Sequence, residues 1–178
     1  MITGQVINNG GCPLIITRAT EYAIRAVLFM ASREPGVTVL KKDICRAMKI
    51  TPAFLTKILQ PLIKCGIVGS QRGVGGGFLL QKQPQDISLL DVIAAEEGMP
   101  FLNTCLLEHD DCERRHFCPV SQVWHQARVN LLATLQQHNF AQLVQMENLN
   151  RDSLPAPLQA WLAEDVAGTA TGNLCSGD

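Results

Sequence analysis

The stretch from residue 40 to residue 81 limits the possible folds most, because two short helical patterns there precede a glycine-rich hairpin pattern. The first helix covers 40–47. After a three-residue connection the second begins at Thr51-Pro52, since threonine caps a helix and proline fits its first turn, and it ends at Gly66. Strand-like segments on either side of the glycine-rich stretch 72–77 then predict a two-stranded wing. This order predicts a winged helix-turn-helix domain.

The flanking sequence predicts further helices at about 17–32, 86–98 and 119–138, with one more turn or two over 139–149. We therefore expect a mainly α fold with a small β-wing and a long dimerisation helix. The expected organisation is a flexible leader (1–14), a winged helix-turn-helix DNA-binding domain (15–83), a short helix (84–98), a cysteine-rich cluster-binding loop (99–118), a dimerisation helix region (119–149) and a C-terminal tail (150–178).

The charges are divided unevenly along the chain. Residues 1–82 carry 11 Lys and Arg against 3 Asp and Glu, a balance of +8, whereas residues 83–178 carry 4 against 13, a balance of −9. This division favours a basic half that meets a polyanion such as DNA. No apolar run is long enough to span a membrane, and the N-terminus does not resemble a signal peptide, so we expect a cytoplasmic protein.

The helix that begins at Thr51 has an apolar face and an opposite face without acidic residues. Leu55, Ile58, Leu59 and Leu62 recur at helical spacing and predict the core side. The opposite side chains suit base edges and phosphates in a major groove. At the wing tip, glycines allow close approach to a duplex, and an arginine can enter a narrow minor groove. The predicted DNA-binding residues are Thr51, Ala53, Thr56, Lys57 and Gln60 on the helix and Arg72, Gly73, Gly75 and Gly76 on the wing.

Pro61 conflicts with this second helix. A proline inside a helix removes one hydrogen bond and clashes with the carbonyl four residues earlier, here that of Lys57. We therefore expect a kink, or a local tightening of the helix near Gln60.

Three cysteines, Cys105, Cys112 and Cys118, lie in an acidic segment without periodicity. Six residues separate the first two and five separate the last two. Closely spaced thiols in such a loop suit a soft metal centre better than a packed core. The Cys-x2–4-Cys pairs of structural zinc sites and the Cys-x-x-Cys of redox dithiols are both absent. The segment by itself predicts a metal site and leaves the metal open.

Three features together resemble the Rrf-two family of bacterial regulators: TRATEYAIRAVLFMA at 17–31, FLTKILQPLIKCGIVGSQRGVGGGFLL at 54–80, and the cysteine triplet. The resemblance covers about residues 15–147. It implies a homodimer, paired through the helix at 119–138, that binds a pseudo-palindromic operator in double-stranded DNA. It also implies that Arg72 is the minor-groove arginine and that Ala53, Thr56 and Lys57 occupy the base-reading positions.

The same resemblance implies an iron–sulfur cluster, 2Fe–2S or 4Fe–4S, held by Cys105, Cys112 and Cys118. The first spacing is one residue longer than is usual in the family. For the fourth ligand, some members use a histidine three residues after the last cysteine, where this chain has Ser121. Others use a carboxylate in the first helix, and the matching residue is Glu21, which we prefer and which the partner chain could contribute.

We expect a transcription regulator whose operator affinity is switched by the cluster in response to redox state, nitric oxide or cluster supply. The cysteine segment lies between the basic half and the dimer helix, where it can bias an equilibrium between two states. One alternative is a winged-helix regulator whose cysteines bind zinc or sense oxidation directly. Less favoured are a protein-interaction module and a cysteine-dependent enzyme using Cys112 and His116, since the chain lacks a pocket-building α/β pattern.

Overall fold

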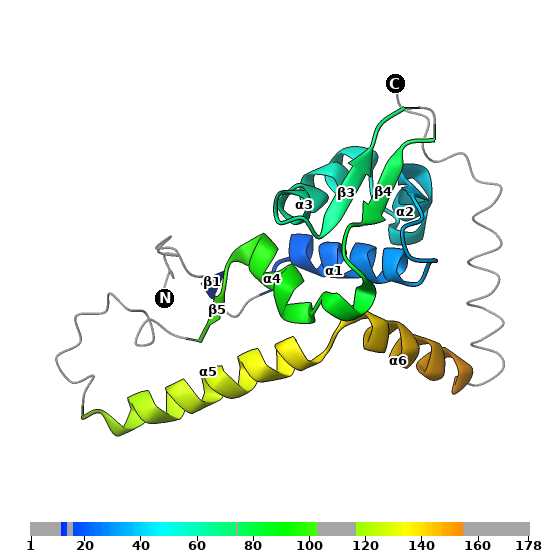
Figure 1. Ribbon diagram of the computed structural model, residues 1–178. Helices are drawn as coiled ribbons and strands as arrows, with labels where there is room; N and C mark the ends of the chain where they lie inside the picture. The colour runs from blue at the N-terminus through cyan, green and yellow to red at the C-terminus, as the bar shows by residue number, and fades with distance from the viewer. Residues whose placement is uncertain (1–11, 14–15, 74, 103–116, 155–178) are drawn as a thin grey trace.

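The computed structural model describes residues 12–13, 16–73, 75–102 and 117–154 (Figure 1). In chain order the elements are β1 (Cys12–Pro13), α1 (Arg18–Ala31), β2 (Val39–Leu40), α2 (Lys41–Met48), α3 (Pro52–Lys64), β3 (Val68–Gln71), β4 (Gly77–Leu80), the 3-10 helix η1 (Pro84–Asp86), α4 (Leu89–Glu97), β5 (Pro100–Phe101), α5 (Pro119–Gln137) and α6 (Phe140–Asp152). The predicted fold class, mainly α with a small β-wing, is confirmed.

Helix α1 lies at the centre of the described domain and contacts α2, α3, α4 and α6. Its N-cap Thr17 accepts a hydrogen bond from the backbone N–H of Thr20, which starts the helix where the sequence predicted. The side chains of Ala23, Ala26 and Val27 are fully buried at helical spacing. Small residues on this face let the neighbouring helices approach α1 closely.

Helices α2 and α3 form the predicted helix-turn-helix. The chain leaves α2 at Lys49, whose left-handed backbone (φ 54°) redirects it toward α3, and Thr51 caps α3. Helix α3 continues through Pro61 as far as Lys64, and Gly66 follows it with φ 67°. The predicted core side is confirmed, because Leu55, Ile58, Leu59 and Leu62 are all buried.

The wing has one strand more than the sequence indicated. β3 and β4 form the predicted antiparallel hairpin, and β2 pairs with the other edge of β4, so the sheet order is β2-β4-β3. Only glycine fits at residue 77, because a Cβ atom there would lie 2.0 Å from the carbonyl oxygen of Val39. The backbones of β2 and β4 therefore approach closely at the base of the wing.

The short helix expected at 86–98 begins later than predicted. Residues Pro84–Asp86 form η1, and α4 starts after Ser88, which exchanges two hydrogen bonds with Asp91 in a capping box. The predicted end at Gly98 is correct.

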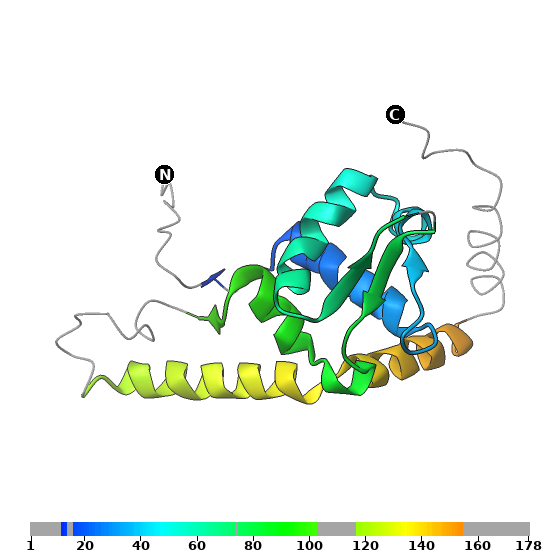
Figure 2. The ribbon, with the colours of Figure 1, turned by 45° about the horizontal axis from the view of Figure 1, so that its top comes forward.

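The region expected to serve dimerisation, 119–149, contains two helices. Asn139 and Gln142 form a second capping box that ends α5 and starts α6 as a separate helix. Phe140 is completely buried, and α6 packs on α1 and η1 inside the described domain. Figure 2 shows α5 continuing beyond the domain, with α6 beneath α1. Among the described helices, α5 alone therefore projects from the domain.

The last residues of the expected leader also have regular structure, because Cys12–Pro13 pair in parallel with Pro100–Phe101. Residues 1–11 and 155–178, which include most of that leader and of the C-terminal tail, lie outside the described residues. So does the segment 103–116, with Cys105 and Cys112.

Candidate functional site

Helix α3 has three exposed side chains on its outer face that make no hydrogen bond to a described residue. Ala53, Lys57 and Gln60 are exposed, as the sequence predicted. The hydroxyl of Thr51 accepts a hydrogen bond from the backbone N–H of Phe54 at 3.3 Å. The half-buried Thr56 donates its hydroxyl proton to the carbonyl of Pro52 at 2.8 Å. These two threonines therefore shape the helix start, while the other three are available to a partner.

The wing tip depends on glycine conformations. Gly73 and Gly75 have φ values of 105° and 84°, which other residues rarely adopt. At Gly76, a Cβ atom would lie 2.6 Å from the carbonyl oxygen of Gln71. Arg72 is exposed at the start of this turn. The tip is therefore a narrow backbone turn with one exposed guanidinium beside it, a shape that can enter a groove.

Helix α3 and the wing lie on the same side of the molecule. In Figures 1 and 2, α3 and the β3–β4 hairpin lie on one side of α1, and α5 and α6 lie on the other. Residues 41–72, which contain α2, α3 and β3, carry 7 Lys and Arg but only one acidic residue, Asp43. This side of the molecule therefore attracts polyanions, and α5 extends from the opposite side.

Of the predicted metal ligands, Cys118 and Glu21 are described. Cys118 is half-buried and is the N-cap residue of α5, but its side chain makes no capping hydrogen bond. The N-terminal end of a helix stabilises negative charge, which suits an anionic sulfur ligand. Glu21 is exposed in the first turn of α1 and makes no side-chain hydrogen bond to a described residue.

No group of three or more His, Cys, Asp or Glu side chains could hold a metal ion within the described residues. Two of the three predicted cysteines lie outside them, so the cluster-binding prediction is not tested. The donor set is nevertheless chemically suitable, because three thiolates and one carboxylate are ligands that iron accepts.

A family model described as "Iron-dependent Transcriptional regulator", Rrf2, matches residues 16–146. This chain belongs to the Rrf2 family. The regulator NsrR of Shouchella clausii is 30% identical over 145 residues, 81% of this chain and 95% of its own length. NsrR of Geobacillus kaustophilus is 30% identical over 131 residues, 73% of this chain and 89% of that one. These relatives are regulators of transcription and not enzymes, which confirms the expectation for this chain.

Solved structures support the same fold. CymR of B. subtilis, described as the global cysteine regulator, has a TM-score of 0.61 at 23% identity and covers 75% of this chain and 98% of its own. IscR of T. potens has a TM-score of 0.59 at 22% identity, covering 80% of this chain and 93% of its own. The Rrf2 chain is therefore a winged-helix, DNA-binding transcription regulator. None of its described helices is both long and apolar enough to cross a membrane.

In the Rrf2 chain, the C-terminal end of α4 is tied to the first turn of α1 by Glu97. One carboxylate oxygen, Oε1, accepts hydrogen bonds from the backbone N–H of Thr17 at 3.2 Å and from its hydroxyl at 2.6 Å. The hydroxyl of the buried Thr20 donates to the same oxygen. Negative charge at a helix N-terminus is stabilising. Glu97 therefore joins the segment that leads into the cysteine loop to the helix that carries Glu21.

The neighbouring Glu96 is in an unfavourable position for a charged carboxylate. Its Oε1 is buried without a hydrogen-bond partner among the described residues. Burial, and secondarily the Glu97 carboxylate, raise the pKa of Glu96 from 4.5 to about 7. In the unfolded chain Glu96 loses its proton at a lower pH than in the folded chain, so folding stability falls as pH rises from 4.5 to about 7.

We therefore expect Glu96→Gln to stabilise the protein at pH 8, where folding of the wild type has to bury a charge, and to have little effect at pH 4.5. Because Glu96 is only partly buried, solvent screens much of the cost, and the expected gain is about 1 kcal/mol. Urea unfolding at the two pH values measures it. An equal gain at both would mean that the Glu96 charge is not responsible.

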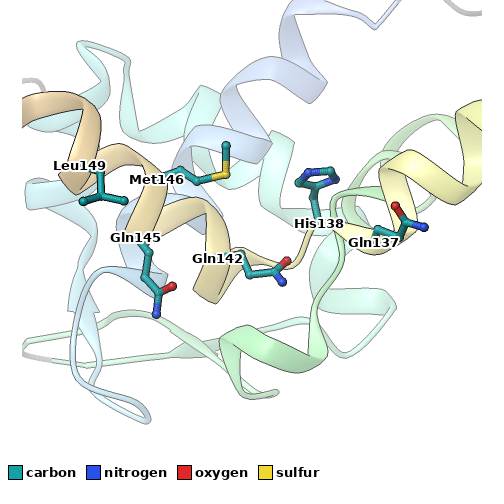
Figure 3. A pocket seen from close by; sticks show the side chains of 6 residues that line it. All are labelled: Gln137, His138, Gln142, Gln145, Met146 and Leu149. Carbon is teal, nitrogen blue, oxygen red and sulfur yellow. The ribbon is translucent and has the colours of Figure 1, made fainter. Parts of the chain in front are cut away.

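An open groove lies where α5 meets α6 (Figure 3). Three glutamines, Gln137, Gln142 and Gln145, line it together with His138, Met146 and Leu149. The Nδ1 atom of His138 is 2.8 Å from the carbonyl of Thr134 and is thereby engaged. The lining has no nucleophile and no second ionisable group, so the groove has no arrangement for catalysis. Its Met146 and Leu149 are exposed apolar side chains of α6.

Proposed function

We propose that this Rrf2 regulator is a homodimer that binds a pseudo-palindromic operator and changes its affinity with the state of an iron–sulfur cluster. The observation that carries the dimer is α5, a 19-residue helix without a single buried residue. Val120, Val123 and Trp124 are exposed by 54%, 67% and 40%. Their spacing of three and four residues puts them on one face of the helix. A second copy of α5 is the natural cover for such a face.

Each protomer would read one half-site. Ala53, Lys57 and Gln60 would face the major groove, and the wing would bring Arg72 toward the adjacent minor groove, with Gly73, Gly75 and Gly76 at the point of closest approach. Thr51 and Thr56 contribute by holding the first turn of α3. Such a regulator would act on the chromosome in the cytoplasm.

Cys105, Cys112 and Cys118 would hold the cluster, with Glu21 of either protomer as the fourth ligand. A bound cluster supplies iron that reacts with oxygen or nitric oxide, and a carboxylate is an exchangeable ligand for it. The chain's own residues provide the connection to DNA binding. Glu97 links the start of the cysteine segment to α1, and Cys118 begins α5. A change in the state of the cluster would therefore act on α1 and on the dimer helix together.

The first experiment is the visible absorbance spectrum, with iron and sulfide analysis, of protein purified without oxygen. We expect visible absorbance with matching iron and sulfide in the wild type and loss of all three in Cys112→Ala. Cys65→Ala is the matched control, because Cys65 is an exposed thiol at the end of α3, outside the cysteine segment. That variant should keep the wild-type spectrum.

Colourless wild-type protein without iron or sulfide would contradict the cluster and assign the cysteines to zinc or to direct thiol sensing. Retained absorbance in Cys112→Ala would contradict the ligand assignment alone. Neither outcome changes the family membership or the winged-helix fold.

A further inference from the structure

The base of the wing contains a side-chain hydrogen bond between residues far apart in the sequence. The hydroxyl of Thr38 donates to Oε1 of Gln71 at 2.5 Å. Thr38 immediately precedes β2, and Gln71 is the last residue of β3, next to Arg72. The bond therefore connects the two outer strands of a sheet in which β4 lies between them.

The register of the sheet explains how this bond can form. Gly77 in β4 pairs with Leu40 on one side and with Gln71 on the other. Side chains of paired residues lie on the same face of a sheet. Because Gly77 has no side chain, Gln71 gains no cross-strand contact from its partner and can extend over β4 toward Thr38. The bond runs diagonally across β4, because Thr38 is two residues before Leu40, the residue that pairs with Gly77 on the far side.

The bond also decides which end of the Gln71 amide is available. With Oε1 accepting from Thr38, the Nε2 group keeps two N–H donors. No described residue accepts from them, and Gln71 is exposed. Arg72, the next residue, is exposed as well. The neutral Gln71 amide, with its two N–H donors, therefore lies beside the Arg72 guanidinium at the start of the wing tip. This combination suits the phosphate oxygens of a DNA backbone.

We propose that Thr38 and Gln71 form a latch that turns the Gln71 amide nitrogen outward to donate to a DNA phosphate beside the minor groove entered by Arg72. Gln71 is then a DNA-contacting residue, and Thr38 is a positioning residue that acts through it. This inference rests on the proposed DNA-binding role of the wing. A phosphate contact carries no sequence information, so it adds affinity to every duplex.

The test compares the full-length wild type with Thr38→Val, Thr38→Ser, Gln71→Leu and the double variant Thr38→Val/Gln71→Leu. The probes are a duplex selected by the wild type from a random-sequence pool and a scrambled duplex of equal length. Fluorescence anisotropy at three salt concentrations gives the affinities. Melting temperatures measure folding, which Thr38→Val should preserve because valine has the shape of threonine.

We expect Thr38→Val and Gln71→Leu each to weaken binding about five- to tenfold on both duplexes. The salt dependence should not change, because no charge is removed. Thr38→Ser should bind like the wild type, since it keeps the hydroxyl. The double variant should equal Gln71→Leu, because Thr38 acts only through Gln71.

Wild-type affinity in Thr38→Val, or additive losses in the double variant, would overturn the latch while leaving the DNA-binding role intact. A loss confined to the selected duplex would overturn the phosphate contact. A wild type that binds neither duplex would instead contradict the proposed function on which the inference rests.

Discussion

Replacing Val123 by glutamate is expected to lower the affinity for a two-half-site operator by about a hundredfold or more. Val123 is 67% exposed in the described chain, so the charge should not disturb the fold of one protomer. In a dimer, the same carboxylate would be buried in an apolar contact between two α5 helices, at a cost that opposes association. A monomer binds only one half-site and loses the gain from the second.

The matched control is Val129→Glu on the same helix. Val129 is 45% exposed, but it lies nine residues after Val120 and thus about half a turn around the helix from it. Sedimentation should give a monomer for Val123→Glu and a dimer for Val129→Glu and the wild type. Affinity for an isolated half-site should be equal in all three. A Val123→Glu protein that remained dimeric would show that this face of α5 is not the interface.

The helix-turn-helix could be predicted because local signals define each part of it. Thr17 and Thr51 cap α1 and α3, and Gly66 ends α3 with a backbone that glycine adopts easily. The three buried leucines and the buried Ile58 of α3 recur at helical spacing. The position of this buried face also predicted which face of the helix is exposed. These signals act within a few residues and need no knowledge of the rest of the chain.

What the sequence did not reveal depends on distant contacts. β2 has only two residues, and it is a strand because β4 lies beside it. The hydrogen bond between Thr38 and Gln71 crosses β4. The parallel pairing of β1 with β5 is equally non-local. Two-residue strands carry no periodicity, so no pattern could have indicated them.

The candidate site was predicted in its position but not in its detail. The outer face of α3 and the wing are where they were expected, whereas the hydroxyls of Thr51 and Thr56 bind the backbone of their own helix. Threonine frequently does this at and near helix starts, where its hydroxyl competes for the same backbone groups. Glu97 was missed because its partners, Thr17 and Thr20, lie about 80 residues earlier.

The boundary between α5 and α6 had a signal that was overlooked. Asn139 followed three residues later by Gln142 is a capping-box pattern, and the two residues exchange hydrogen bonds as such a box requires. The long helix was predicted to end near residue 138, but the one or two further turns predicted over 139–149 were assigned to the same dimerisation region. The cap pattern identifies these turns as a separate helix that begins after Asn139.

The junction between α5 and α6 contains Phe140, whose replacement has the largest expected effect on stability. Phe140→Ala should lower the free energy of unfolding by about 3–5 kcal/mol, because the ring is completely buried in the domain core. The backbone around it is also fixed. The N–H of Phe140 donates to the carbonyl of Ile87 at 3.0 Å, and that of Leu89 donates to the carbonyl of His138 at 2.9 Å. Urea unfolding measures the loss, and Leu149→Ala on the same helix, 68% exposed, should be nearly neutral.

The same junction connects the projecting α5 to the domain that contains α3, the proposed DNA-reading helix. Two half-sites are bound together only if each reading helix keeps a fixed direction relative to the dimer axis. Where Phe140→Ala is still folded and dimeric, its affinity for the full operator should therefore fall while its half-site affinity is kept. Equal affinity for the full operator in Phe140→Ala and wild type would show that α6 stabilises the domain without fixing the direction of α5.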